Sequence, residues 1–94
     1  MARGITVFKP TKEQLEALGT ERWDPWSCEV SSFDWEYEGT ETCYVHEGRV
    51  TVETADGAVV VEAGDVVQFE DGLRCRWVVT APIRKVYSFD VGKI

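Results

Sequence analysis

Hydrophobic positions follow two different spacings along the chain, and the change falls near residue 26. In the first part, Leu15 and Leu18 lie three residues apart, which is the spacing of a short apolar stripe on a helix. Thr11, with Gln14 three residues later, has the pattern of a capping box at a helix start, and Gly19 is a typical helix stop. The pattern therefore predicts a short strand over residues 5–8 and one helix over residues 11–18.

Beyond residue 26, apolar and polar side chains alternate with the period-two spacing of strands. Gly, Asp and Pro interrupt this pattern at intervals of roughly eight to twelve residues, which is typical of an all-β sandwich or barrel. Asp56-Gly57 predicts a tight hairpin, because a type I′ turn needs positive φ, and further turns are predicted at residues 47–48 and 63–64. The predicted strands cover residues 27–29, 33–38, 40–47, 49–54, 58–62, 65–69, 74–80 and 83–90.

Strand alternation also assigns side chains to the interior of the predicted fold. Inward-facing Trp35 and Tyr37 leave Glu36 and Glu38 in solvent, which suits their charge. The same alternation predicts that the carboxylate of Glu41, the thiols of Cys43 and Cys75, and the indole of Trp77 also face the interior. The sequence thus predicts a ligand pocket between two antiparallel sheets, lined by Trp35, Tyr37, Glu41, Cys43, Cys75 and Trp77.

Length and composition limit the possible functions. The 94 residues suit one domain over residues 1–94, with an N-terminal strand and helix segment at 1–26 and a β-barrel at 27–90. The net charge of −7 disfavours binding to nucleic acid and to anionic membrane surfaces. There is no apolar run typical of a signal peptide or membrane span, and three cysteines are an odd count for a disulfide framework. We therefore expect a cytoplasmic or other reducing compartment, without secretion.

The segments FDWEYEGTETCYVHEGRV, EAGDVVQFEDGLRCRW and IRKVYSF resemble the cupin superfamily. Specifically, they are similar to small single-domain cupins grouped with the (S)-ureidoglycine aminohydrolase cupin domain, whose members are largely uncharacterised. The resemblance covers nearly the whole chain. It implies an all-β, RmlC-like jelly-roll barrel with one short N-terminal helix, and it makes a homodimer a plausible assembly.

The resemblance also indicates where a metal-binding cupin would place its ligands. Its histidine positions fall on Trp35, Tyr37 and Cys75, and its glutamate position falls on Glu41. Only Glu41 and Cys75 keep a ligating side chain, while Tyr37 would ligate only as a phenolate and Trp35 has no ligating atom. The cofactor therefore stays open: a divalent metal is possible but is not supported by histidine ligands.

Glu41 is the residue on which the functional interpretation depends, and three roles are open. It could be a structural carboxylate that accepts hydrogen bonds from Tyr37 and tryptophan indoles, because buried polar groups are normally hydrogen-bonded. It could also bind a ligand or act as the catalytic residue, or it could ligate a metal. Cys43 and Cys75 are either inert buried thiols or, if their Cα atoms lie within about 7 Å, a redox pair.

The remaining candidates have ordinary structural interpretations. His46 is predicted on the opposite face from Glu41, as an exposed strand residue. Trp23 and Trp26 are expected to cover one barrel mouth or to form a subunit contact. The four basic residues of the last strands suit either a basic rim or, more simply, cross-strand pairing with glutamates: Arg74, Arg76, Arg84 and Lys85.

Three hypotheses about function follow from these residues. In the first, the chain is a cupin without the metal-binding histidines, and its aromatic pocket binds a small polar metabolite anchored by Glu41. In the second, it is a metal-dependent or metal-free enzyme acting on a small carbon–nitrogen compound, like ureidoglycine aminohydrolase. In the third, it is a structural or partner-binding barrel with a filled interior.

Overall fold

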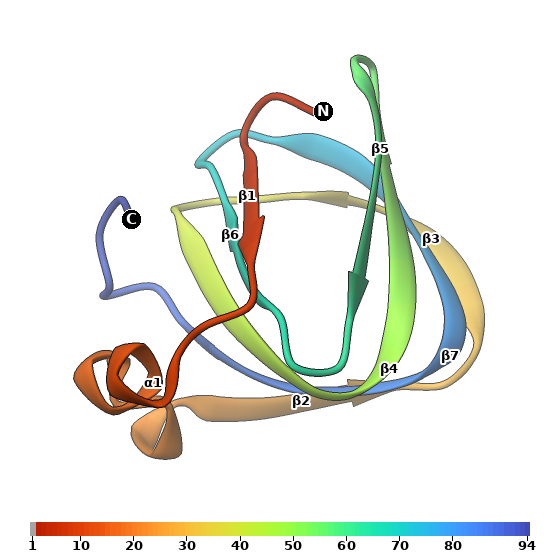
Figure 1. Cartoon of the computed structure of the whole chain (residues 1–94). Coiled ribbons are helices and arrows are strands. Elements are labelled where there is room, and N and C mark those ends of the chain that lie inside the picture. The colour runs from red at the N-terminus through yellow and green to blue at the C-terminus, as the bar shows by residue number, and fades with distance from the viewer. Residues whose placement is uncertain (1) are drawn as a thin grey trace.

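The computed structural model describes residues 2–94 as one antiparallel sheet of seven strands with a short N-terminal helix (Figure 1). β4 and β7 are much longer than the other strands and form the centre of the sheet. The elements are β1 (Ile5–Phe8), α1 (Lys12–Leu18), the 3₁₀ helix η1 (Thr20–Arg22), β2 (Asp24–Cys28), β3 (Ser31–Glu36), β4 (Glu41–Thr54), β5 (Gly57–Glu62), β6 (Val66–Phe69) and β7 (Arg74–Ser88).

The N-terminal elements form where the sequence predicts them. The Gln14 backbone N–H donates to Thr11 Oγ1 at 3.1 Å, and the Thr11 backbone N–H donates to Gln14 Oε1 at 2.8 Å, so both bonds of the capping box are present. Gly19 ends α1 in the left-handed conformation, with φ of 70°. The 3₁₀ helix that follows directly was not predicted, because it has no hydrophobic periodicity of its own.

The predicted turn at residues 47–48 is wrong. Instead, the two predicted strands on either side of it merge into β4, and the two predicted strands at 74–80 and 83–90 merge into β7. Gly48 lies inside β4, where the register against β7 shifts, and has φ of 94°. A Cβ atom at this position would lie only 2.1 Å from the carbonyl oxygen of Pro82, so glycine lets the bent strands approach closely.

The shorter strands flank β4 and β7. β6 and β5 pair with successive parts of β4, while β2 and β3 pair with successive parts of β7, and β1 extends the sheet beyond β6. The strands therefore belong to one continuous sheet rather than to the two predicted sheets, because β4 and β7 bend and serve both halves (Figure 1). Over residues 2–94, β1 and β2 end the strand order without pairing to each other, so the hydrogen-bonded sheet is open.

The hydrophobic core lies inside the curve of the sheet. Val50, Val52, Val61, Val67 and Phe69 are buried, whereas Val59 is only partly buried and packs against them. The hairpin between β4 and β5 forms, with Thr54 opposite Gly57. Its two turn residues are Ala55 and Asp56, and among the described residues only glycines have positive φ, so the predicted type I′ turn at Asp56-Gly57 is wrong. Among the described residues, no helix is long and apolar enough to cross a membrane.

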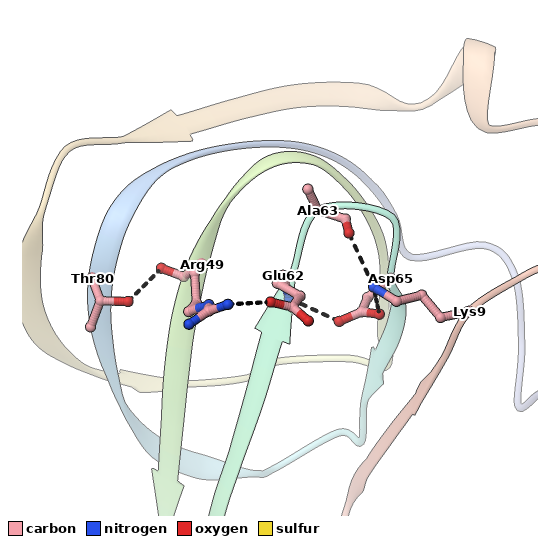
Figure 2. Close-up of polar contacts among 6 residues, drawn as sticks. All are labelled: Lys9, Arg49, Glu62, Ala63, Asp65 and Thr80. Atoms are coloured by element: carbon pink, nitrogen blue, oxygen red, sulfur yellow. Dashed lines mark hydrogen bonds and ion pairs between the residues drawn. The ribbon is translucent and has the colours of Figure 1, made fainter.

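A polar cluster fixes the turn between β5 and β6 (Figure 2). Lys9 Nζ contacts Asp65 Oδ1 at 2.8 Å and donates to the carbonyl oxygen of Ala63 at 3.1 Å. Asp65 Oδ2 accepts the backbone N–H of Glu62 at 2.8 Å, and the Glu62 carboxylate pairs with Arg49 at 2.7 Å. The predicted turn at residues 63–64 is therefore confirmed, and the side chain of the buried Asp65 holds it on both sides.

Candidate functional site

A cavity of about 300 Å³ opens between β2, β3, β4 and β7, and its walls are mostly aromatic. Its only charged lining residues are one carboxylate and one ammonium group, Glu41 and Lys85. This size is at the lower end of pockets that hold small molecules. The lining residues are Trp26, Phe33, Trp35, Tyr37, Glu41, Trp77, Lys85, Tyr87 and Phe89.

Strand register brings these side chains together from distant parts of the sequence. Trp26 of β2 lies opposite Lys85 of β7, and Phe33 of β3 lies opposite Trp77 of β7. Because successive side chains of a strand alternate between its faces, Lys85 and Tyr87 point to the same side of β7. Glu41 begins β4 and completes the cavity floor from the other neighbour of β7.

Three side chains form a buried polar triad beneath the aromatic walls: Glu41, Lys85 and Cys43. Lys85 Nζ donates to Glu41 Oε2 at 2.9 Å and to Cys43 Sγ at 3.2 Å. Cys43 Sγ in turn donates to the same Glu41 oxygen at 2.9 Å. The side chains of Lys85 and Glu41 are only 6% and 9% exposed, so each charge depends on the other for compensation.

The aromatic walls also stabilise the charge of Lys85. Its Nζ atom lies 4.8 Å from the ring centroid of Trp77, 5.0 Å from that of Trp26 and 6.0 Å from that of Tyr87. A cation within about 6 Å of an aromatic face is attracted by the negative potential of the ring. The ammonium therefore has a carboxylate on one side and π faces on the others.

The triad has a defined protonation state at neutral pH. Burial disfavours the charged form of Lys85, but the neighbouring sulfur of Cys43 and the carboxylate of Glu41 outweigh it, so the pKa of Lys85 is raised. Burial is also the main reason that the pKa of Cys43 rises to about 12. Lys85 is thus an ammonium and Cys43 a thiol, and neither is an activated nucleophile.

Two polar atoms of the site remain available to a ligand. Glu41 Oε1 makes no hydrogen bond within residues 2–94. Because this oxygen is also not fully buried, it is exposed to the cavity that Glu41 lines. The Tyr37 hydroxyl accepts the indole N–H of Trp77 at 3.1 Å and keeps its own proton for donation. Burial, reinforced by Glu41, raises the pKa of Tyr37, so this group stays a neutral phenol.

The six residues predicted to line a pocket have four different locations. Tyr37, Glu41 and Trp77 line the cavity and are buried, while Trp35 lies at its rim with 52% of its surface exposed. Cys43 lies just below the floor, in contact with Glu41. Cys75 lies opposite Trp35 in the strand register and joins the hydrophobic core without lining the cavity.

The predicted partners of the cysteines and of Glu41 differ from the observed ones. Glu41 bonds Lys85 and Cys43, whereas Tyr37 bonds Trp77, so the predicted bond from Tyr37 to the carboxylate is wrong. Cys43 lies opposite Tyr87 of β7, so the register does not pair it with Cys75, and both thiols are free. Burial is the main reason that the pKa of Cys75 rises to about 11, which makes this thiol unreactive as well.

The basic residues of β7 divide into two kinds. The three arginines lie on the outer face and form the predicted cross-strand ion pairs, Arg74 with Glu36, Arg76 with Asp34 and Arg84 with Glu47. Lys85 also pairs with a glutamate of a neighbouring strand, as predicted, but this pair with Glu41 is buried in the cavity floor and not part of a basic rim. Its position could be predicted from the sequence, because it has the same strand parity as Trp77 once residues 74–88 are taken as one strand.

Comparisons with known proteins identify the family. The EutQ-like cupin domain matches residues 15–87. A DUF861 family protein from Thermotoga maritima is 51% identical, with a TM-score of 0.88 over 90% of this chain and 98% of that one. No curated protein matches the chain.

More distant structures share the fold. The EutQ protein of Clostridium difficile has a TM-score of 0.62 at 21% identity, over 67% of this chain and 50% of that one. A DUF1255 protein of unknown function from Acidithiobacillus ferrooxidans has a TM-score of 0.63 at 20% identity, over 66% and 60%. The chain therefore belongs to the EutQ-like cupin domain family, and the prediction of a cupin is confirmed.

The donor set at this site does not fit the metal that many cupins hold. Within residues 2–94, no three His, Cys, Asp or Glu side chains gather where they could bind one ion. Glu41 Oε2 already accepts hydrogen bonds from Lys85 and Cys43, and Tyr37 is a phenol rather than a phenolate. The residues of this site therefore do not support a metal-dependent reaction.

Proposed function

We propose that this protein binds a small polar metabolite inside a cupin barrel, in the aromatic cavity above Glu41 and Lys85. One observation carries the proposal: a buried ion pair forms the floor of an otherwise aromatic cavity of about 300 Å³. A purely structural ion pair gains nothing from an adjoining open space. A ligand, by contrast, would gain a fixed carboxylate oxygen, a phenol donor and flat walls for its apolar part.

The charges of the floor define the kind of ligand that fits. Glu41 and Lys85 neutralise each other, so a ligand with a large net charge would enter an aromatic cavity without a counter-charge, which is costly. A neutral or zwitterionic compound that donates a hydrogen bond to Glu41 Oε1 and accepts one from Tyr37 avoids this cost. Its ring or alkyl body would pack against Trp26, Trp77 and their neighbours.

This proposal explains the site better than the two alternatives do. A structural or partner-binding barrel with a filled interior leaves the cavity and the free oxygen of Glu41 without a role. Metal-dependent turnover of a small carbon–nitrogen compound, as in ureidoglycine aminohydrolase, lacks a fitting donor set among residues 2–94. Nucleophilic catalysis is disfavoured because Lys85 and Cys43 both keep their protons at neutral pH.

A binding screen with matched variants tests the proposal. A panel of neutral and zwitterionic metabolites is titrated into the wild type while tryptophan fluorescence and the melting temperature are recorded. For any compound that binds, Glu41→Gln should weaken affinity about tenfold or more, because a hydrogen bond to a charged group contributes about 1.5–3 kcal/mol. Glu47→Gln, an exposed carboxylate of the same strand, is the control and should leave affinity unchanged. Equal affinity for the wild type and Glu41→Gln would contradict the proposal.

A further inference from the structure

We propose that the ammonium group of Lys85 occupies the position next to Glu41 that a divalent metal ion would otherwise take. It neutralises the Glu41 carboxylate and thereby excludes metal from this cupin cavity. This inference does not depend on which metabolite binds. It concerns the disagreement between the chain and the metal-binding members of its fold, to which Lys85 contributes in addition to the absence of histidine ligands among residues 2–94.

The geometry places the ammonium where two potential metal donors converge. Glu41 Oε2 and Cys43 Sγ are 2.9 Å apart, and Lys85 Nζ lies 2.9 Å from the oxygen and 3.2 Å from the sulfur. A carboxylate oxygen and a sulfur together form part of a site for zinc or cobalt. In this chain, the position in contact with both atoms is occupied by the ammonium group of Lys85.

The ammonium also excludes a second cation, both by charge repulsion and because its side chain blocks access to Glu41. Lys85 is only 6% exposed and lies between Glu41 and the faces of Trp26 and Trp77, so the fold leaves little room for it to move aside. A divalent ion beside it would meet a like charge at close range in a poorly solvated site.

Removal of Lys85 should therefore let Glu41 and Cys43 hold a metal ion as two protein ligands, with water completing its coordination, more tightly than the wild type does. In Lys85→Ala, the carboxylate of Glu41 loses its counter-charge and the Cys43 sulfur loses its donor. A bound Zn²⁺ or Co²⁺ would compensate the carboxylate and promote deprotonation of the thiol. All proteins in the test carry Cys28→Ser, because Cys28 is the only half-exposed thiol of the described chain and would bind these ions on its own.

The test is titration of each protein with Zn²⁺ by calorimetry and with Co²⁺ by absorption spectroscopy. We expect Lys85→Ala to bind about one equivalent, about tenfold or more tightly than the wild type, because a like charge at contact range costs at least a decade of affinity. Co²⁺ should give a sulfur-to-metal charge-transfer band that disappears when Cys43→Ser is added. Lys9→Ala, which removes an exposed lysine from the ion pair with Asp65, is the control and should behave like the wild type.

Two results would overturn the proposal. The first is a folded Lys85→Ala protein, judged by circular dichroism, that binds no more metal than the wild type. The second needs no Lys85 variant to fold: one equivalent of Zn²⁺ bound by the wild type and lost in Glu41→Gln. If Lys85→Ala is unfolded without metal, the proposal predicts that Zn²⁺ restores its circular dichroism signal and that Mg²⁺, which is a poor match for sulfur, does not.

Discussion

Two lysine–carboxylate pairs of similar length have different consequences in this molecule. Lys85–Glu41 and Lys9–Asp65 have N–O distances of 2.9 and 2.8 Å, and both carboxylates are buried. However, the side chain of Lys85 is 6% exposed, whereas that of Lys9 is 60% exposed. Lys9 joins a polar network that fixes a turn (Figure 2), while Lys85 forms the floor of an aromatic cavity. From this contrast we expect that solvent access, rather than contact distance, decides how much such a pair contributes to stability and to function.

The largest expected effect comes from breaking the buried pair on one side only. Lys85→Met leaves the Glu41 carboxylate buried without a counter-charge and should lower the free energy of unfolding by about 3–5 kcal/mol. The double variant Glu41→Met/Lys85→Met removes both charges and should recover most of this loss. Guanidinium unfolding at neutral pH measures both. A double variant as unstable as Lys85→Met would show that the charges are not coupled.

Alkaline pH should weaken the buried triad through Cys43. The folded state raises the pKa of this thiol from 9.0 to about 12, so it keeps its proton where the unfolded chain loses it. Its contribution to stability is therefore complete below pH 9 and declines as the pH rises towards 12. The raised pKa of Lys85 acts in the same direction, because its pairing is lost only at high pH.

Urea midpoints between pH 8 and pH 11 measure this decline. Cys43→Ser should show a shallower loss of stability, because a serine hydroxyl does not ionise in this range. Cys75 also has a raised pKa, but it contributes equally to both proteins and cancels in the comparison. Parallel curves for the wild type and Cys43→Ser would show that Cys43 does not cause the decline.

The smallest expected effect comes from the exposed pair. Lys9→Ala should reduce the free energy of unfolding by less than about 1 kcal/mol, since its ammonium is largely solvated. Asp65 keeps its hydrogen bond from the backbone N–H of Glu62, so the turn remains supported. The loss should shrink further in high salt, which screens exposed charges. A loss as large as that of Lys85→Met would refute the contrast between the two pairs.

Much of the fold could be predicted because local signals agree with it. The capping box of α1 is a short-range pattern that forms as predicted. The Asp56-Gly57 pattern correctly indicates a hairpin, although its turn lies one residue earlier, at Ala55-Asp56. Gly48 misled the prediction, because positive φ serves a turn and a strand bend equally well. Only the close approach of Pro82, far away in sequence, decides in favour of the bend.

The candidate site could be predicted only in part, for a related reason. Strand parity places Tyr37, Glu41 and Trp77 on the inner face, and they line the cavity. The pairing of Glu41 with Lys85 depends on register across residues 44 apart in sequence, which no local pattern encodes. The alternative that Lys85 belongs to a basic rim was therefore wrong, whereas its pairing with a glutamate of a neighbouring strand is confirmed.

The most direct test of the central claim is to record the lysine side-chain ammonium signals by ¹H–¹⁵N NMR at neutral pH. An ammonium buried between a carboxylate and aromatic rings is protected from exchange with water, so Lys85 should give a resolved signal, shifted by the ring currents of Trp26 and Trp77. The signal should disappear in Lys85→Met and move in Glu41→Gln, while the exposed Lys9 gives none. Absence of a protected ammonium signal in the wild type would contradict the account, because Lys85 would then be solvated or neutral rather than paired with Glu41.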